Sequence, residues 1–171
     1  MTVPGDAVHV KWAYRIAAVT ALTLWVVFNV EITHIILMFV IYITAAKYWS
    51  PDIDLDSEPY QRWGILRFLI YPYKEMVKHR SRWSHGWIIG AITINVYITI
   101  VFALIIAVLN LVWLPAIEPA IDIGQAFITR VVTFDMTHED WVAVGVFYAC
   151  SYYAHLEHVL VDKVFTGDRK A

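Results

Sequence analysis

Apolar residues divide the chain into three long hydrophobic regions, at about 12–49, 87–114 and 140–162. A helix that crosses a bilayer needs about 20 mostly apolar residues, and the first region is nearly twice that length. Its middle carries Asn29, Glu31 and His34. Because charged groups are costly at mid-bilayer, we interpret it as a hairpin, with spans at 12–28 and 34–49 and a tight turn at 29–33. One long tilted helix with a buried Glu31 is the alternative.

The polar stretches between these regions complete the predicted architecture. Pro51 disfavours helix in the residue before it and ends the second span. Residues 57–80 mix apolar and cationic side chains and predict an interfacial helical segment. Residues 115–139 predict a loop or a short re-entrant element, and Ser84 is suited to cap the third span. The pattern therefore predicts an all-α, polytopic membrane protein with about four transmembrane helices, at 12–28, 34–49, 87–114 and 140–162, forming a single domain over 1–171.

Composition supports a membrane protein. The chain is 60% hydrophobic, against about 45–50% in soluble domains. The lone Cys150 excludes an internal disulfide bond. Lys11 and Arg15 precede an apolar stretch, but no small-residue cleavage site follows, so we expect an uncleaved span rather than a signal peptide. The net charge of −2 indicates little about partners; we expect membrane lipids and no nucleic acid.

The basic residues indicate the orientation. With four spans, both termini and residues 50–86 share one side of the membrane. Twelve of the thirteen Lys and Arg residues fall on that side, and only Arg130 falls on the other. Because loops rich in Lys and Arg stay in the cytoplasm, we place both termini there.

The same topology gathers titratable side chains from five segments at the cytoplasmic face. These are His9, Asp52, Asp54, Asp56, His79, His85, His155, His158 and Asp162. His34 and His138 fall at the opposite face. Each residue alone has an ordinary explanation, such as an interfacial anchor or a solvated loop. Their convergence favours a metal site, because ionisable residues in or near a membrane are candidates for function.

Local spacing suggests how the ligands converge. An extended backbone would point the alternating aspartates of PDIDLD the same way. His155, His158 and Asp162 are spaced three and four apart, on one helix face, and Glu157 points away from it. His79 and His85 converge only if the chain bends between them, for example at Ser81 or Ser84. Imidazole and carboxylate ligands suit zinc, iron or manganese; zinc is favoured, with one to three ions.

The central motifs also resemble a known family. SPDIDLDS, YQRWGILRF, PY and HRSRWSHG are similar to motifs of bacterial membrane proteins regarded as metal-binding. Those proteins are related to inner-membrane metal-dependent hydrolases and, remotely, to zinc-dependent phospholipase C proteins. The resemblance covers most of the chain and implies a bacterial inner-membrane location. The matching positions are His9, Asp52, Asp54, His79, His85, His158 and Asp162. His9 lies in an atypical setting, DAVHV, and His155 is additional, so His155 or His158 could be the ligand.

The leading hypothesis is a membrane-bound, metal-dependent hydrolase of phosphoesters, with a lipid or another phosphoester as substrate. Arg80 and Arg82 would hold the anionic group, and Asp56 or Asp162 would act as general base. One alternative is a non-catalytic small subunit of a larger membrane complex. Another is a di-iron oxidoreductase, although five histidines at one face are few for that chemistry.

Overall fold

All regular structure in the described residues is helical. The computed structural model describes residues 6–112, 126, 129 and 135–166. Six α-helices and two 3-10 helices lie within them, and they confirm the all-α prediction. The predicted loop at 115–139 lies mostly outside the described residues. In chain order the elements are α1 (Asp6–Val26), α2 (Ile32–Tyr48), η1 (Pro51–Asp54), α3 (Glu58–Gln61), η2 (Gly64–Leu66), α4 (Arg67–Met76), α5 (Ile89–Val112) and α7 (His138–Thr166).

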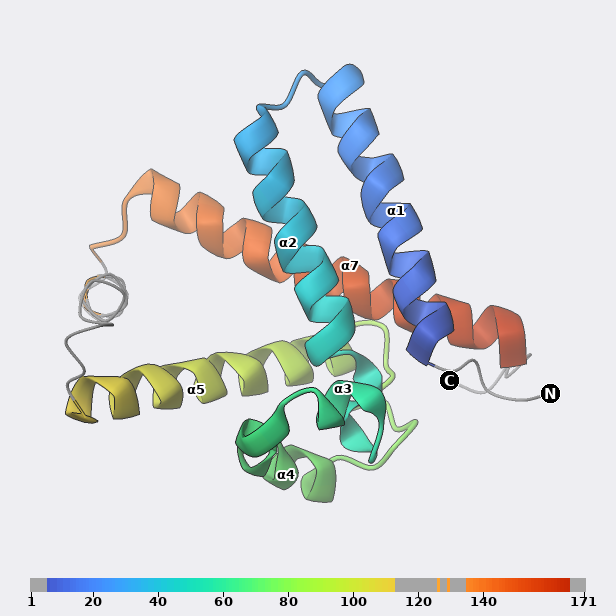
Figure 1. Ribbon diagram of the computed structural model, residues 1–171, viewed down its shortest axis with the longest axis vertical. Coiled ribbons are helices and arrows are strands. Elements are labelled where there is room, and N and C mark those ends of the chain that lie inside the picture. The colour runs from blue at the N-terminus through green and yellow to red at the C-terminus, as the bar shows by residue number, and fades with distance from the viewer. Residues whose placement is uncertain (1–5, 113–125, 127–128, 130–134, 167–171) are drawn as a thin grey trace.

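The first hydrophobic region forms the predicted hairpin. Helix α1 ends at Val26 and α2 begins at Ile32, so a single long helix over 12–49 is excluded. Asn29 adopts a left-handed backbone conformation, with φ of 49°, which asparagine tolerates better than most residues. The amide of Val30 donates a hydrogen bond to the carbonyl oxygen of Leu24 at 3.0 Å and closes the turn. In Figure 1 both helices of this hairpin run toward α7, which crosses them.

Helix α2 is central to the packing, because it contacts both α1 and α7. Small buried residues, Ala13 on α1 and Ala45 on α2, allow the helix backbones to approach closely. At the end of α2 the Trp49 indole donates a hydrogen bond to Ser151 Oγ on α7 at 3.4 Å, and its ring meets Phe102 of α5 edge-on. These contacts hold the carboxyl end of α2 between α5 and α7.

The segment after α2 folds into short helices beneath that junction (Figure 1). Ile53 of η1 and Ile70 of α4 are almost fully buried, and Tyr97 of α5 donates a hydrogen bond to the Leu69 carbonyl oxygen at 2.6 Å. The predicted helical segment at 57–80 is therefore present as α3, η2 and α4. Its outer face carries apolar side chains, including Ile65 at 88% exposure and Phe68 at 61%. Its location in a membrane interface stays a prediction.

Two helical segments among the described residues are long and apolar enough to cross a membrane. They are Ile32–Asp54 and Ile89–Leu109, and they contain or overlap the predicted spans at 34–49 and 87–114. The predicted spans at 12–28 and 140–162 are helical, as parts of α1 and α7, but do not reach the same apolarity. Lys11 and Arg15 in α1, and Glu157 and Asp162 in α7, account for the difference in part. A four-span arrangement stays a prediction.

Candidate metal centre

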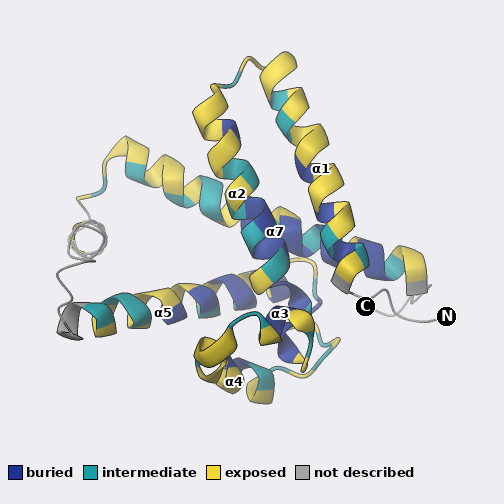
Figure 2. Ribbon diagram, in the orientation of Figure 1, coloured by how far each residue is buried: buried dark blue, intermediate teal, exposed yellow. Residues whose placement is uncertain are grey.

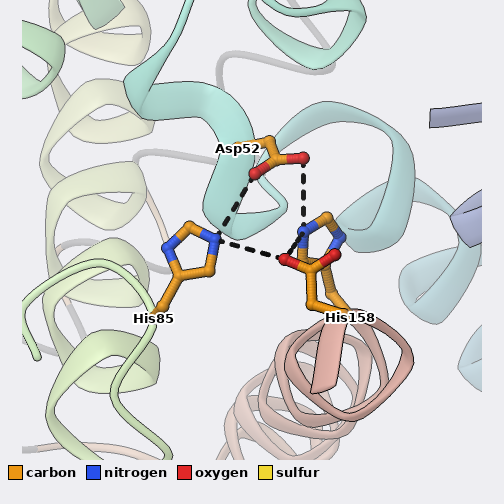
Figure 3. Close-up of side chains that lie close together, drawn as sticks. Asp52, His85 and His158 are labelled. Atoms are coloured by element: carbon orange, nitrogen blue, oxygen red, sulfur yellow. Dashed lines mark ion pairs between the residues drawn. The ribbon is translucent and has the colours of Figure 1, made fainter. Parts of the chain in front are cut away.

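Four ligating side chains from three parts of the chain meet in one buried group. We call Asp52, His85, His158 and Asp162 the four-residue cluster; one ligand atom from each lies within 4.8 Å of every other. Asp52 Oδ1 lies 3.4 Å from His85 Nε2, and Asp52 Oδ2 lies 3.3 Å from His158 Nε2. Figure 3 shows Asp52 between the two imidazole rings. Asp162 Oδ2 lies 3.8 Å from His85 Nε2 and completes the group.

A second group shares one of these residues. Asp54, His79 and His85, the three-residue cluster, also bring ligand atoms within 4.8 Å of one another. His79 Nδ1 lies 2.8 Å from Asp54 Oδ1, and the rings of His79 and His85 meet edge-on with centroids 4.8 Å apart. His85 therefore stands between two adjacent sets of ligands.

His9, from the first turns of α1, contacts Asp162 and His158 of the four-residue cluster. Its Nε2 lies 3.2 Å from Asp162 Oδ1, and its ring stacks on His158 with centroids 3.8 Å apart. His9 is thus next to the four ligands and supports two of them, in the way that outer partners orient metal ligands.

The side chains present fit a divalent metal. Nε2 of His85, Nε2 of His158 and Oδ2 of Asp54 are buried and have no hydrogen-bond partner among the described residues. Buried polar atoms normally have hydrogen-bond partners, so converging imidazole nitrogens and carboxylate oxygens without such partners fit a site that binds a cation. Two histidines and two aspartates form a ligand set typical of zinc, manganese or iron. The identity of the metal stays a prediction.

The charge of Asp54 affects its neighbours outside the apolar helices. Its hydrogen bond with His79 raises the pKa of that imidazole above the ordinary value, although partial burial opposes the shift. Burial and, to a smaller extent, the Asp54 carboxylate raise the pKa of the Tyr73 phenol. Tyr73 therefore stays protonated beside Asp54. In the sequence Tyr73 appears only within the PY motif and was given no role of its own, because it lies among several aromatic residues.

The 3-10 geometry of η1 separates the three aspartates. We expected an extended backbone that points Asp52, Asp54 and Asp56 the same way; that expectation is wrong, because Pro51 opens a helical turn. With about three residues per turn, residues two apart point in different directions. Asp52 enters the four-residue cluster and Asp54 the three-residue cluster. Asp56 stays exposed, 2.7 Å from Lys74 Nζ.

The stretch between His79 and His85 bends as predicted. The amides of Ser84 and His85 both donate hydrogen bonds to the Ser81 carbonyl oxygen, which turns the chain so that both imidazoles face inward. The expected helix cap at Ser84 is wrong, because α5 begins at Ile89. Ser84 is instead fully buried, with its Oγ 3.0 Å from His85 Nδ1. It helps to orient the His85 ring, whose Nε2 faces the aspartates.

The remaining predicted site residues lie outside both clusters. His155 Nε2 donates a hydrogen bond to the Gly86 carbonyl oxygen at 3.1 Å, so His155 fastens the loop before α5 to α7, and it is His158 that joins the cluster. Arg80 and Arg82 are exposed on the bend, and the Arg82 guanidinium lies 5.7 Å from the centre of the Trp83 ring.

The close contact of Gly90 with this loop leads to a prediction. A Cβ on Gly90 would lie 2.7 Å from the Ser84 carbonyl oxygen and 3.1 Å from His155 Cε1. Gly90→Ala should therefore push the loop that carries His85 away from α7, costing about 1–3 kcal/mol and lowering metal content. Gly145→Ala is the matched control, because a Cβ there meets nothing within 4 Å. Thermal unfolding and elemental analysis measure the stability and the metal content of both variants. Equal stability and equal metal content in Gly90→Ala and Gly145→Ala would contradict the prediction.

The helical fold and the buried histidine–aspartate clusters together define a metal-binding protein. The chain belongs to the family described as uncharacterized metal-binding protein (DUF2227), whose model matches residues 6–170. No curated protein and no solved structure matches the chain. The expected resemblance to a metal-binding family is thereby confirmed. Its relation to membrane hydrolases and to phospholipase C proteins stays a prediction.

Proposed function

We propose that the protein is a membrane-bound, metal-dependent hydrolase of phosphoesters. The observation that carries the proposal is the pair of adjacent clusters that share His85. Paired metal ions assist phosphoester hydrolysis because they stabilise both the attacking and the leaving oxygen. We expect two ions, within the predicted range of one to three, and favour zinc over manganese or iron.

The protein's own residues would bind the metal, attract the substrate and accept the proton of the attacking water. When bound, a divalent metal supplies Lewis acidity and lowers the pKa of a water ligand. Asp162 is our choice of general base, because its Oδ2 faces His85 and His158 whereas its Oδ1 points away from them, 3.2 Å from His9 Nε2. Asp56, the other predicted base, already pairs with Lys74. Arg80 and Arg82 would attract the phosphate from the exposed bend next to the clusters.

Exposed apolar surface supports a membrane location. Figure 2 shows exposed residues along the outer faces of α1, α2 and α5. They include Leu22 at 58%, Val40 at 54% and Val108 at 58% exposure. Contiguous apolar surface of this extent marks a contact with lipid or protein. We propose an integral protein of a bacterial inner membrane, with four spans, both termini in the cytoplasm and a phosphoester, in particular a lipid, as substrate.

The activity itself is directly testable. Purified protein supplied with zinc or manganese should hydrolyse a chromogenic phosphodiester. Asp54→Ala and His85→Ala should lower kcat by at least about a hundredfold, because each removes a ligand. Asp56→Asn, on the neighbouring surface, should retain activity close to wild type. Retained activity in both ligand variants would refute the proposal.

A structural metal in a small subunit of a membrane complex is the second candidate. It is favoured by burial, because the side chains of His85 and His158 are only 5% and 4% exposed and leave little access for substrate. The metal would then hold together η1, α7 and the loop before α5, and His9 of α1 would contact two of its ligands. Full metal loading, no hydrolysis of any phosphoester and co-purification of a stoichiometric partner would favour this function.

A further inference from the structure

A second candidate ligand site lies between α1, α2 and α7, next to the metal centre. A cavity of about 530 Å³ lies there, within the range of about 300–1,000 Å³ typical of small-molecule pockets. Its walls are almost entirely apolar and include Leu24, Met38, Phe39 and Leu156. Neither metal cluster contributes a residue to this lining.

Two polar side chains in the lining of this cavity carry atoms that lack a hydrogen-bond partner among the described residues. Glu157 of α7 and Tyr42 of α2 line it, and they are only 5% and 8% exposed. Glu157 Oε1 and the Tyr42 hydroxyl have no hydrogen-bond partner among the described residues. A buried polar group without a partner costs about 1–3 kcal/mol, so a carboxyl and a phenol in an apolar chamber indicate a ligand that hydrogen-bonds to them.

The position of Glu157 connects this cavity to the metal centre. Glu157 directly precedes His158 in α7, so one turn of helix presents a carboxyl to the cavity and an imidazole to the four-residue cluster. On α1, His9 lies at the cluster, and the cavity is lined by later residues from Ile16 to Leu24. The cavity therefore extends along the hairpin, away from the metal ligands.

The cavity is also open to the exterior. Ile16, Tyr153 and Leu160 line it, and they are 38%, 63% and 44% exposed at the surface. Where α1 and α7 face a membrane, a hydrocarbon chain could enter sideways between them.

We propose that this cavity binds the hydrocarbon chain of a lipid alcohol, with the lipid hydroxyl hydrogen-bonded by Glu157 and Tyr42. A neutral hydroxyl suits this pair, because it can donate to the carboxyl and accept from the phenol. The cavity lining recognises the apolar chain, and the hydroxyl end lies at Glu157, the residue before His158 of the four-residue cluster.

The choice of lipid alcohol rests on the proposed function. Hydrolysis of a lipid phosphoester forms a bond between phosphorus and the water oxygen and breaks the bond between phosphorus and the lipid oxygen. One proton of the water ends on that lipid oxygen, so the product is a lipid alcohol. Binding in the cavity requires no catalysis and can be measured separately.

Photo-crosslinking tests the binding. Hexadecanol with a diazirine at mid-chain is irradiated with the full-length protein in detergent, and the modified residues are mapped by mass spectrometry. We expect modification at the cavity residues of α1, α2 and α7, competed by unlabelled hexadecanol and only weakly by hexadecane. Ala21→Trp, which fills the cavity, should lower the yield about tenfold, equivalent to roughly 1.4 kcal/mol. Leu22→Trp, on the outer face of the same helix, should retain it.

Glu157→Leu provides a second readout, should Ala21→Trp fail to fold. It removes the carboxyl and preserves the apolar lining, so hexadecanol should lose its advantage over hexadecane as a competitor. Modification spread evenly over the outer faces, or an unchanged preference for hexadecanol in Glu157→Leu, would overturn the proposal. Cavity labelling without phosphoester hydrolysis would refute only the proposed function. Hydrolysis without cavity labelling would refute only the cavity site.

Discussion

Alanine in place of His158 should remove the metal from the protein. Loss of an outer partner of a metal ligand alone weakens metal binding by about 10- to 100-fold, so loss of a direct ligand should cost at least about a hundredfold. His158 Nε2 is buried, lies 3.3 Å from Asp52 and 4.0 Å from Asp162, and has no hydrogen-bond partner among the described residues. Elemental analysis of dialysed, detergent-purified protein measures the effect.

Two other histidines serve as controls for this prediction. His34→Ala should retain the full metal content, because its side chain is 62% exposed at the hairpin turn. His155→Ala should lose less metal than His158→Ala, because His155 contacts the Gly86 carbonyl oxygen rather than the aspartates. Undiminished metal in His158→Ala would place the binding site elsewhere. Equal losses of metal in His155→Ala and His158→Ala would contradict the assignment of His158 rather than His155 as the ligand.

Chelation should strongly destabilise the fold. Without a cation, Asp52 and Asp162 remain close together in a largely buried group, and the three parts of the chain that form the cluster lose a common attachment. A metal present at about 100 to 1,000 times its dissociation constant contributes roughly 2.7–4.1 kcal/mol. For a chain of this size that corresponds to a fall in Tm of about 10 °C after treatment with EDTA. Differential scanning fluorimetry in detergent measures it.

The His158→Ala variant also makes this measurement specific. It should begin near the Tm of the chelated wild type and respond little to EDTA, because it has no metal to lose. Zinc or manganese should restore the wild type. A wild-type Tm that is insensitive to chelation would show that the metal contributes nothing to stability.

The fold was predictable where hydrophobic periodicity and length dominate. The hairpin followed from Asn29 and Glu31, since polar residues in the middle of a long apolar region favour a turn. The start of α5 was less predictable, because Ser84 is chemically suited to cap a helix. Its hydroxyl instead lies beside His85, a contact between neighbouring residues that depends on the tertiary position of the bend. The 3-10 turn of η1 was not predicted either, because the alternating aspartates of PDIDLD suggested an extended backbone.

For the candidate site, the sequence predicted that these side chains converge but not how they divide between two clusters. The predicted span order placed His9, His85 and His158 at one membrane face, and in the structure these residues contact each other or the same aspartate. It could not separate Asp54 from Asp52, because their directions depend on backbone dihedral angles. It could not distinguish His155 from His158 either, since both fit the same helix face. Glu157 was set aside because it points away from the ligands, and only packing against α1 and α2 reveals the cavity that it faces.

The distance in sequence between the residues of the four-residue cluster has a consequence for biosynthesis. Asp52 lies in η1, His85 lies in the bend before α5, and Asp162 lies near the end of α7. During translation η1 and the bend leave the ribosome before α7 does, so the four-residue cluster stays incomplete until α7 has been made. We therefore expect a metal to bind this cluster only after α7 has been synthesised.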